Sequence, residues 1–357
     1  MAWVGNVTWL ADALRAEGLQ VIEQDGWRAR GHGAYRDIRG VMAHHTAGGT
    51  PHDWRVVLEG RPDLPGPLSN LALEKDGTYR VIAAGVCWHA GRGSWPGWPT
   101  NNANFHVLGI EAVSSGRPDS RGEYDWTLAQ LDAYARGCAV LVVQAGFPVR
   151  NVVGHKEYSA EGKIDPAGFD MDVFRAEVGR IVERIRAGIP ASDRSAFPLP
   201  PGYYFGPLEG PVESISGQHP LEWPLWRVGL REWQAAVGAP VTGVWDAATA
   251  DAARAVQRAN GWEENGLIGP GTWGAGLRDG VPAEPLPPAP LPPAPVAPEP
   301  VVPEPGPPAP VPPTPVPPVP VPPGGAGSGS WWRRAIDRTW QRLRDVSRGV
   351  LGRGGSR

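Results

Sequence analysis

The sequence predicts an α/β fold in which helices flank a mixed β-sheet. Strand-like segments at residues 40–46, 79–83 and 107–113 alternate with helical segments along the chain. Two longer segments, residues 128–145 and 171–187, repeat apolar residues at the spacing of one helix face. Alternating strands and helices are typical of a sheet covered by helices. The pattern ends near residue 190, so we assign residues 1–190 to this domain.

Each of the two predicted helices has one apolar stripe, which we expect to face the sheet. In the first helix the stripe comprises Leu128, Leu131, Tyr134, Cys138, Leu141 and Ala145. In the second it comprises Phe174, Val178, Ile181 and Ile185. Between strands and helices, residues 93–102 are predicted to form a long loop. Trp95 and Trp98 in this loop either contact substrate or pack against the domain.

After residue 190 the composition changes several times. Residues 191–220 are predicted to form a connector, and residues 221–280 a small three-helix domain built on an internal repeat. Segments 233–249 and 256–272, offset by 23 residues, match in Gln, Ala, Gly, Gly and Thr. Asp246 and Pro270 are helix start signals in the two repeat units. Four apolar residues are predicted for the core of this domain: Trp233, Val237, Val256 and Leu267.

The C-terminal part is a linker followed by a basic tail. Residues 281–330 form a Pro/Gly-rich linker, because prolines account for 23 of the 42 residues in 282–323. Such a segment cannot pack a core and adopts an extended polyproline II helix, so it is predicted to be a stiff spacer. Residues 331–357 carry eight arginines and two aspartates, and an apolar stripe predicts an amphipathic helix. It either binds an anionic membrane or wall polymer or packs on a partner helix.

Composition narrows the class of protein. A chain of 357 residues is long enough for two or three domains, and its net charge of −3 says little about partners. Two cysteines, Cys87 and Cys138, provide neither a disulfide framework nor a zinc clip. The N-terminus has no signal-peptide pattern, and no apolar run reaches about 18 residues. We therefore expect synthesis in the cytoplasm.

Two separate segments contain the ligands of a candidate zinc site. Residues 41–46 read V-M-A-H-H-T, and residues 154–166 read G-H-K-E-Y-S-A-E-G-K-I-D-P. Six of the eight histidines lie between residues 44 and 155, which favours a site over scattered surface positions. Catalytic zinc takes three protein ligands and keeps one position for water. His44, His155 and Asp165 are the predicted ligands.

These motifs resemble those of a known enzyme family. H-H-T-A in a strand, I-E at residues 110–111 and H-x7-K-x-D-P from residue 155 are similar to zinc-dependent N-acetylmuramoyl-L-alanine amidases, in particular to phage endolysins. That family is related to peptidoglycan recognition proteins, and the resemblance covers about residues 1–190. It implies that His44, His155 and Asp165 bind Zn²⁺, that Glu111 is the general base and that Lys163 stabilises the oxyanion.

The same roles agree with the chemistry of amide hydrolysis. The reaction needs an activated water, a positive group near the oxyanion and a proton shuttle to the leaving amine. Lys163 is one of only three lysines against 31 arginines, so a lysine beside a ligand is an unusual choice of surface charge. The alternatives are a solvated cation for Lys163 and a structural salt bridge for Glu111.

Four further residues are assigned, Asn70 and His89 by the same resemblance and Trp95 and His45 by their local sequence. Asn70 stands where many relatives have His or Tyr, and we expect it to bind substrate through its amide. His89, in C-W-H-A-G, is either a substrate-side residue or a half-buried structural histidine. Trp95 is a third candidate substrate contact. His45 is predicted to point away from the metal, because adjacent strand residues face opposite sides of a sheet.

The function implied is hydrolysis of the amide bond between N-acetylmuramic acid and L-alanine in peptidoglycan, for host cell lysis. Residues 221–280 resemble the peptidoglycan-binding domain found beside many wall hydrolases. The expected partners are peptidoglycan and a holin that releases the protein from the host cytoplasm, with no nucleic acid. The alternative is a non-catalytic peptidoglycan recognition protein, which keeps the fold without the reaction.

Overall fold

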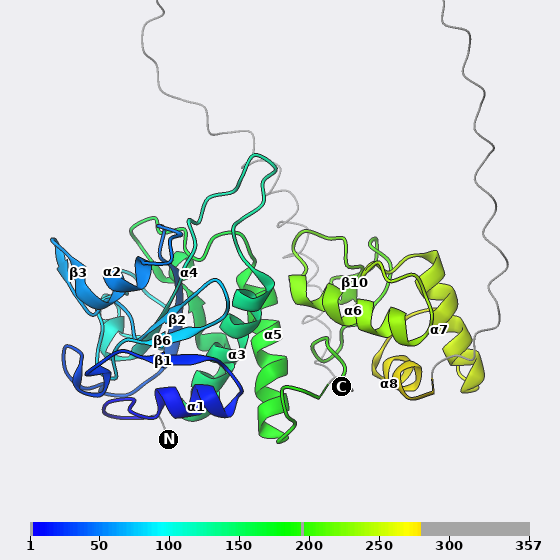
Figure 1. The fold of residues 1–357 in the computed structure, drawn as a ribbon, viewed down its shortest axis with the longest axis horizontal. Helices are drawn as coiled ribbons and strands as arrows, with labels where there is room; N and C mark the ends of the chain where they lie inside the picture. The colour runs from blue at the N-terminus through cyan, green and yellow to red at the C-terminus, as the bar shows by residue number, and fades with distance from the viewer. Residues whose placement is uncertain (1–2, 194–195, 280–357) are drawn as a thin grey trace, which may run out of the picture. The chain divides into compact units, whose positions relative to one another are not determined.

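The computed structural model describes residues 3–193 and 196–279 and confirms a mixed sheet flanked by helices (Figure 1). The main sheet has six strands in the order β1-β6-β5-β7-β2-β8. All neighbouring strands are parallel except β5 and β6. The strands are β1 (Val21–Glu23), β2 (Gly40–His45), β5 (Leu71–Leu73), β6 (Tyr79–Val81), β7 (Val107–Ala112) and β8 (Val152–Gly154).

The helices and the remaining short elements complete the described chain. The α-helices are α1 (Leu10–Ala16), α2 (Asp53–Glu59), α3 (Leu128–Ala145), α4 (His155–Tyr158), α5 (Met171–Arg186), α6 (Pro224–Ala236), α7 (Ala247–Ala259) and α8 (Pro270–Asp279). The 3₁₀ helices are η1 (Trp27–Ala29), η2 (Ala103–Phe105) and η3 (Val149–Asn151), and the short strand pairs are β3 (Gly60–Arg61) with β4 (Leu64–Pro65) and β9 (Tyr204–Phe205) with β10 (Ser214–Ile215). In the described segments, no helix has the length and hydropathy needed to cross a membrane.

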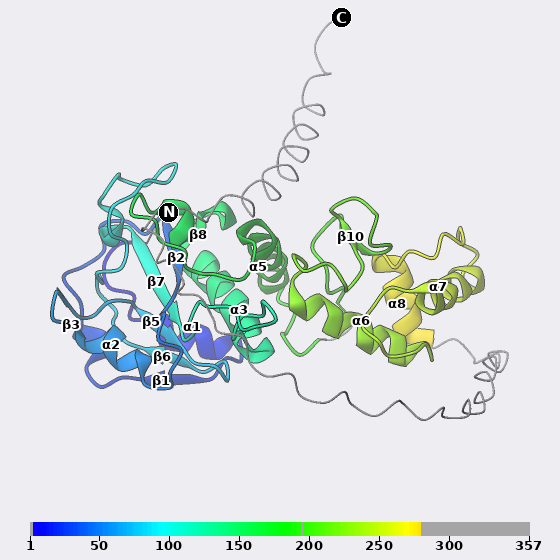
Figure 2. The same ribbon diagram turned by 90° about the horizontal axis from the view of Figure 1, so that it is seen from above.

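The two faces of the sheet are covered differently. Successive residues of β2 point to opposite faces of the sheet. Val41 and Ala43 belong to the large core formed with α1, α3 and α5. Met42 packs with Trp98 and Tyr158 on the other face. His44 therefore projects on the face of Met42, and His45 projects toward the helices. Because β2 lies between β7 and β8, its carboxyl end is flanked by the ends of two parallel strands (Figure 2).

The predicted helices agree closely with the structure. The first begins and ends where expected, at Leu128 and Ala145, and the second ends at Arg186. Leu128 is the exception in the first stripe, since 49% of it is exposed at the first turn of α3. The thiols of Cys87 and Cys138 are free and buried, and burial raises the pKa of both.

The helical module, residues 221–279, repeats one hydrogen-bond pattern at the predicted offset. The Gln234 side chain donates to the Val244 carbonyl and the Thr249 hydroxyl and accepts from Gly243 N–H. Gln257, 23 residues later, makes the corresponding bonds to Leu267, Thr272 and Gly266. Each glutamine therefore closes the loop to the next helix.

The start signals and most of the predicted core of this module are confirmed. Asp246 caps α7 by accepting from Thr249 N–H, and Pro270 is the first residue of α8. Trp233, Val237 and Val256 are buried, but Leu267 is only partly buried. Its neighbour Ile268 is buried instead because it bridges to Phe205. The linker and the basic tail predicted for residues 281–357 lie outside the described residues.

Candidate metal centre

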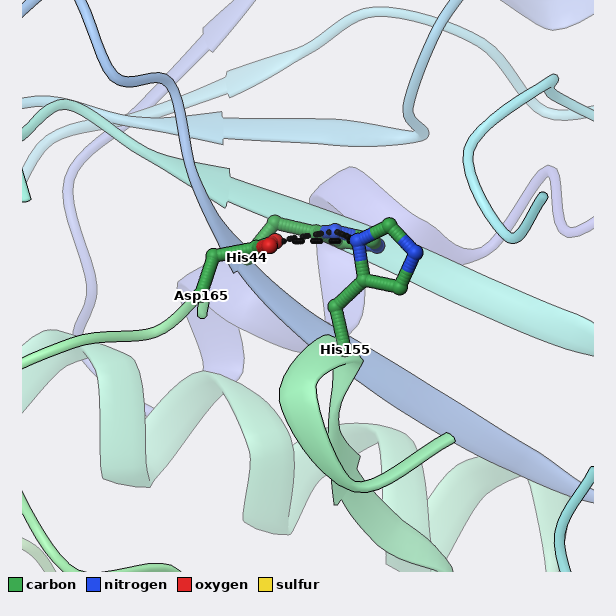
Figure 3. Close-up of side chains that lie close together, drawn as sticks. All are labelled: His44, His155 and Asp165. Carbon is green, nitrogen blue, oxygen red and sulfur yellow. Dashed lines mark hydrogen bonds and ion pairs between the residues drawn. The ribbon is translucent and has the colours of Figure 1, made fainter. Parts of the chain in front are cut away.

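The three predicted ligands meet at the carboxyl ends of β2 and β8. His44 is near the end of β2, and His155 is the first residue of α4, directly after β8. Asp165 reaches the two rings from the segment between α4 and α5, and all three side chains point toward one another (Figure 3). The two Nδ1 atoms are 3.1 Å apart, and Asp165 Oδ2 lies 2.9 Å from His44 Nδ1 and 3.1 Å from His155 Nδ1. All three residues are buried.

Backbone carbonyls determine which ring nitrogens carry protons. A carbonyl only accepts, so the 3.1 Å contact with the Ala90 carbonyl requires a proton on His155 Nε2. The Val107 carbonyl likewise requires a proton on His89 Nε2. Burial lowers the pKa of His89, so the ring is neutral and its Nδ1 accepts from His44 Nε2 at 3.1 Å. In neutral rings, both facing Nδ1 atoms are then unprotonated.

This arrangement suits a metal cation. Two nitrogen lone pairs and a carboxylate oxygen at about hydrogen-bond distance repel one another unless a positive charge lies among them. A tetrahedral ion with bonds of about 2.0–2.2 Å holds its donors roughly 3.3–3.5 Å apart, only slightly farther than here. Burial lowers the pKa of His44 to about 4, which keeps the ring neutral and available as a ligand. His44, His155 and Asp165 therefore form a candidate metal site.

Glu111 lies beside the ligands on the next strand. It is the register partner of His44 in the β2–β7 pair, and its Oε2 atom is buried without a hydrogen-bond partner. Burial, and secondarily the charge of Asp165, raises the pKa of Glu111 to about 8. Within the described chain no salt bridge includes Glu111, which argues against the structural alternative.

Two cations act on Glu111 from the rim of the site. Lys163 is exposed, and its charge opposes the rise in the pKa of Glu111. Arg61, on β3, acts in the same direction and was not predicted from the sequence. The structure thus brings Lys163 within electrostatic range of Glu111. Stabilisation of an oxyanion by Lys163 remains a prediction.

Asn70 does not have the predicted substrate-binding position. Its side chain is fully buried. Its oxygen accepts from the Tyr35 hydroxyl and Gly109 N–H, and its nitrogen donates to the carbonyls of Ala83 and Gly85. Every hydrogen-bonding group of the amide is used within the protein, so none is left for substrate.

We predict that Asn70→Ala lowers stability. The substitution leaves up to four buried polar groups unpaired, which should cost about 3 kcal/mol or more and lower Tm by roughly 6–12 °C. Thermal melts of the full-length variant test this, with Gln218→Ala at an exposed position as the control. An unchanged Tm with weaker substrate binding would instead restore Asn70 as a binding residue.

The other predicted substrate contacts are placed as follows. Both nitrogens of His89 are engaged, with His44 and Val107, which favours a structural role that orients a ligand. Gly109 permits this position, because a Cβ there would lie 3.1 Å from the His89 ring.

Trp98 is buried and packs against Tyr158, while Trp95 is half-buried at the edge of the same cluster. Substrate contact by Trp95 remains a prediction.

His45 and the remaining histidines lie outside the ligand cluster. His45 accepts from Ala167 N–H on the helix side of the sheet, as the alternation of strand residues predicted. His106 pairs with Asp37, and His52 precedes α2. Three of the six clustered histidines, His44, His89 and His155, therefore converge.

Lys156 is a site-forming residue that sequence reasoning missed. Its ammonium group donates to the carbonyls of Pro166 (2.7 Å) and Phe169 (2.8 Å), and its backbone N–H donates to the Asp165 carbonyl. Lys156 thus holds the segment that carries Asp165. The scarcity of lysine, which pointed to Lys163, applies equally to Lys156 and was the available signal.

Two buried histidines and an aspartate lie beside an unpaired carboxyl group at the carboxyl edge of a mostly parallel sheet, and this set has the ligand chemistry of a metal-dependent hydrolase. Residues 34–168 match the family model of N-acetylmuramoyl-L-alanine amidase, and this range contains all three candidate ligands, Glu111 and Lys163. The segment is therefore an N-acetylmuramoyl-L-alanine amidase domain, which hydrolyses the bond between N-acetylmuramic acid and L-alanine in peptidoglycan.

Solved structures show more distant similarity. The amidase AmiD from E. coli, in complex with anhydro-N-acetylmuramic acid-L-Ala-D-gamma-Glu-L-Lys, is 19% identical, with 71% of this chain and 95% of AmiD covered and a TM-score of 0.30. AmpDh3 from Pseudomonas aeruginosa is 18% identical, with the same coverage and a TM-score of 0.31. A mutant endolysin from Bacillus subtilis is 20% identical, with 45% and 99% covered and a TM-score of 0.31. No curated protein matches significantly.

Proposed function

We propose that the protein is a zinc-dependent amidase that degrades the bacterial cell wall during host cell lysis, as phage endolysins do. The observation that carries this proposal is the pair of Nδ1 atoms of His44 and His155, which lie 3.1 Å apart beside the Asp165 carboxylate. Two nitrogen donors and one oxygen donor match the ligand set of catalytic zinc sites, in which a fourth position stays open.

The proposed roles of the surrounding residues follow from their positions. Zinc bound to this ligand set would lower the pKa of a water molecule and polarise the amide carbonyl. Glu111 has a free carboxyl oxygen directed into a buried environment, and its pKa of about 8 lies near neutral pH. A group with such a pKa exchanges protons readily, so Glu111 takes the proton of the attacking water and delivers it to the leaving amine. Lys163 supplies positive charge for the oxyanion.

We assign wall binding to the helical module. A catalytic domain joined to a second folded module is useful on an insoluble polymer, because two attachments raise the effective substrate concentration. The basic tail at residues 331–357 is proposed to contact an anionic membrane or wall polymer. Release from the host cytoplasm would then require a holin-type protein.

The test is hydrolysis of purified peptidoglycan by the full-length protein. We expect new L-alanine amino termini to appear, to fall to background when a chelator removes the metal, and to return when Zn²⁺ is added. Mg²⁺ should not restore activity, since it prefers oxygen ligands in octahedral geometry. Peptidoglycan binding without release of amino termini would assign the protein to the non-catalytic recognition class and remove the roles proposed above.

A further inference from the structure

The metal ligand Asp165 lies in a segment with little regular structure. Between α4 and α5 the backbone forms no helix or strand, and Lys163 and Ile164 are exposed. The position of Asp165 therefore depends on tertiary contacts of the residues that follow it. Four hydrogen bonds come from the amidase domain: two from the Lys156 ammonium group, one from the Trp126 indole to the Ala167 carbonyl, and one from Ala167 N–H to His45.

The apolar anchor of this segment is Phe169, four residues after Asp165. Its ring packs edge-on against Trp126, with centroids 5.4 Å apart, and lies 5.3 Å from Phe174 at the first turn of α5. The Phe169 carbonyl also accepts from Lys156, so the ring and backbone of this residue are fixed together. Any group that covers the Phe169 ring therefore restrains the chain that leads back to Asp165.

One such group comes from outside the amidase domain. Trp223, the residue before α6, is buried with 1% exposure and packs edge-on against Phe169, with centroids 5.7 Å apart and an interplanar angle of 87°. It also lies 5.4 Å from Phe174. The described residues of the amidase domain and of the helical module belong to one compact unit. Without the module, both phenylalanine rings would lose this cover.

A second contact fixes the orientation of α6 on α5. The Trp226 indole N–H donates to Glu177 Oε2 at 3.0 Å, and Glu177, with 4% exposure, pairs with Arg180. A buried carboxylate is costly unless it is paired, so this bond favours one docked position of the module. Among the described residues, the ring contacts of Phe169 are to Trp126, Tyr134, Phe174 and Trp223, and that of Trp226 is to Tyr203. Docking of the module through Trp226 can therefore be tested separately from positioning of Asp165 through Trp223.

We propose that Trp223 is a positioning residue for the metal ligand Asp165, acting through Phe169. This inference rests on the proposed metal-dependent function. The module then does more than bring the enzyme to the wall: it completes the support of the metal site. Outer contacts that orient metal ligands typically change metal affinity by about 10–100-fold when removed.

The experiment compares zinc affinity in full-length variants by competition with a chromophoric chelator. Trp223→Leu and Phe169→Leu should each weaken zinc binding by about 10-fold. The double variant should be little weaker than either single one, because both substitutions break the same contact. Steady-state kinetics on a soluble muropeptide should show kcat falling at limiting zinc and recovering at saturating zinc.

Trp226→Phe is the matched control, since it removes the bond to Glu177 at the same interface without touching Phe169. Its zinc affinity should stay within about twofold of that of the unmodified protein. If Trp223→Leu does not fold, Phe169→Leu tests the same contact with an intact module. Zinc affinities of Trp223→Leu and Phe169→Leu equal to the control would overturn the inference. Failure of the unmodified protein to bind zinc or to cleave peptidoglycan would instead refute the proposed function itself.

Discussion

Replacing Asp165 by alanine is expected to abolish tight zinc binding and to reduce kcat/KM on peptidoglycan by about 10³-fold or more. A catalytic metal ion typically contributes several kcal/mol to transition-state stabilisation, and each ~1.4 kcal/mol corresponds to a factor of ten in rate. Loss of the only charged ligand leaves two neutral imidazoles, a much weaker set for a divalent ion. Metal content after dialysis and release of L-alanine amino termini measure both effects.

Asp12→Ala is the control for this substitution. Asp12 is on α1, and 77% of its side chain is exposed. This variant should keep the zinc content and activity of the unmodified protein. If Asp165→Ala retained one zinc ion per chain with full activity, the ligand assignment would be wrong. Equivalent losses in His44→Ala and His155→Ala would show that the three residues act as one site.

Glu111→Gln is expected to lower kcat by about 10²–10⁴-fold while zinc content stays unchanged. The amide has nearly the shape of the carboxylic acid but cannot take up and release a proton. Because Glu111 is not a proposed metal ligand, a loss of activity with full metal occupancy distinguishes proton transfer from metal binding. A fall in kcat of less than about tenfold would exclude Glu111 as the principal general base.

The same variant has an expected effect on stability after the metal has been removed. The pKa of Glu111 rises from 4.5 to about 8 on folding, so the folded protein holds a proton that the unfolded chain releases. The free energy of unfolding therefore falls as pH rises from about 4.5 to about 8. Glu111→Gln has no titrating group at this position, so its free energy of unfolding does not show this decrease. We expect the variant to gain about 3–4 kcal/mol relative to the parent between pH 5 and pH 8. An equal stability difference at both pH values would contradict the raised pKa.

The fold could be predicted where the elements are long. Helices α3 and α5 have 18 and 16 residues, enough turns for an apolar stripe to stand out. The strands β1, β5 and β8 have only three residues each, and buried strands of a parallel sheet have no polar alternation. Strand β6 is equally short, but apolar residues continue from its end to Ala84. Strands β2, β6 and β7 were therefore predictable, whereas β1, β5, β8 and the strand order were not.

The site was predictable to the extent that it depends on local motifs. His44, Glu111, His155 and Asp165 each occur in a recognisable short pattern, and the structure places all four together. The role of Asn70 was not predictable, because its four partners lie up to 39 residues away in sequence. The contact of Trp223 with Phe169 spans more than 50 residues between two segments with no shared motif.

The order of the strands also bears on how the native state is reached. Strand β2 pairs with β7 and β8, and His44 meets His155 only across 111 residues of chain. Such non-local pairing forms late and slows folding, since a long loop must close before any contact compensates for its entropy. A metal ion would find no assembled ligand set in the early chain. The binding energy of such an ion would therefore act mainly on the native state, where it would slow unfolding rather than speed folding.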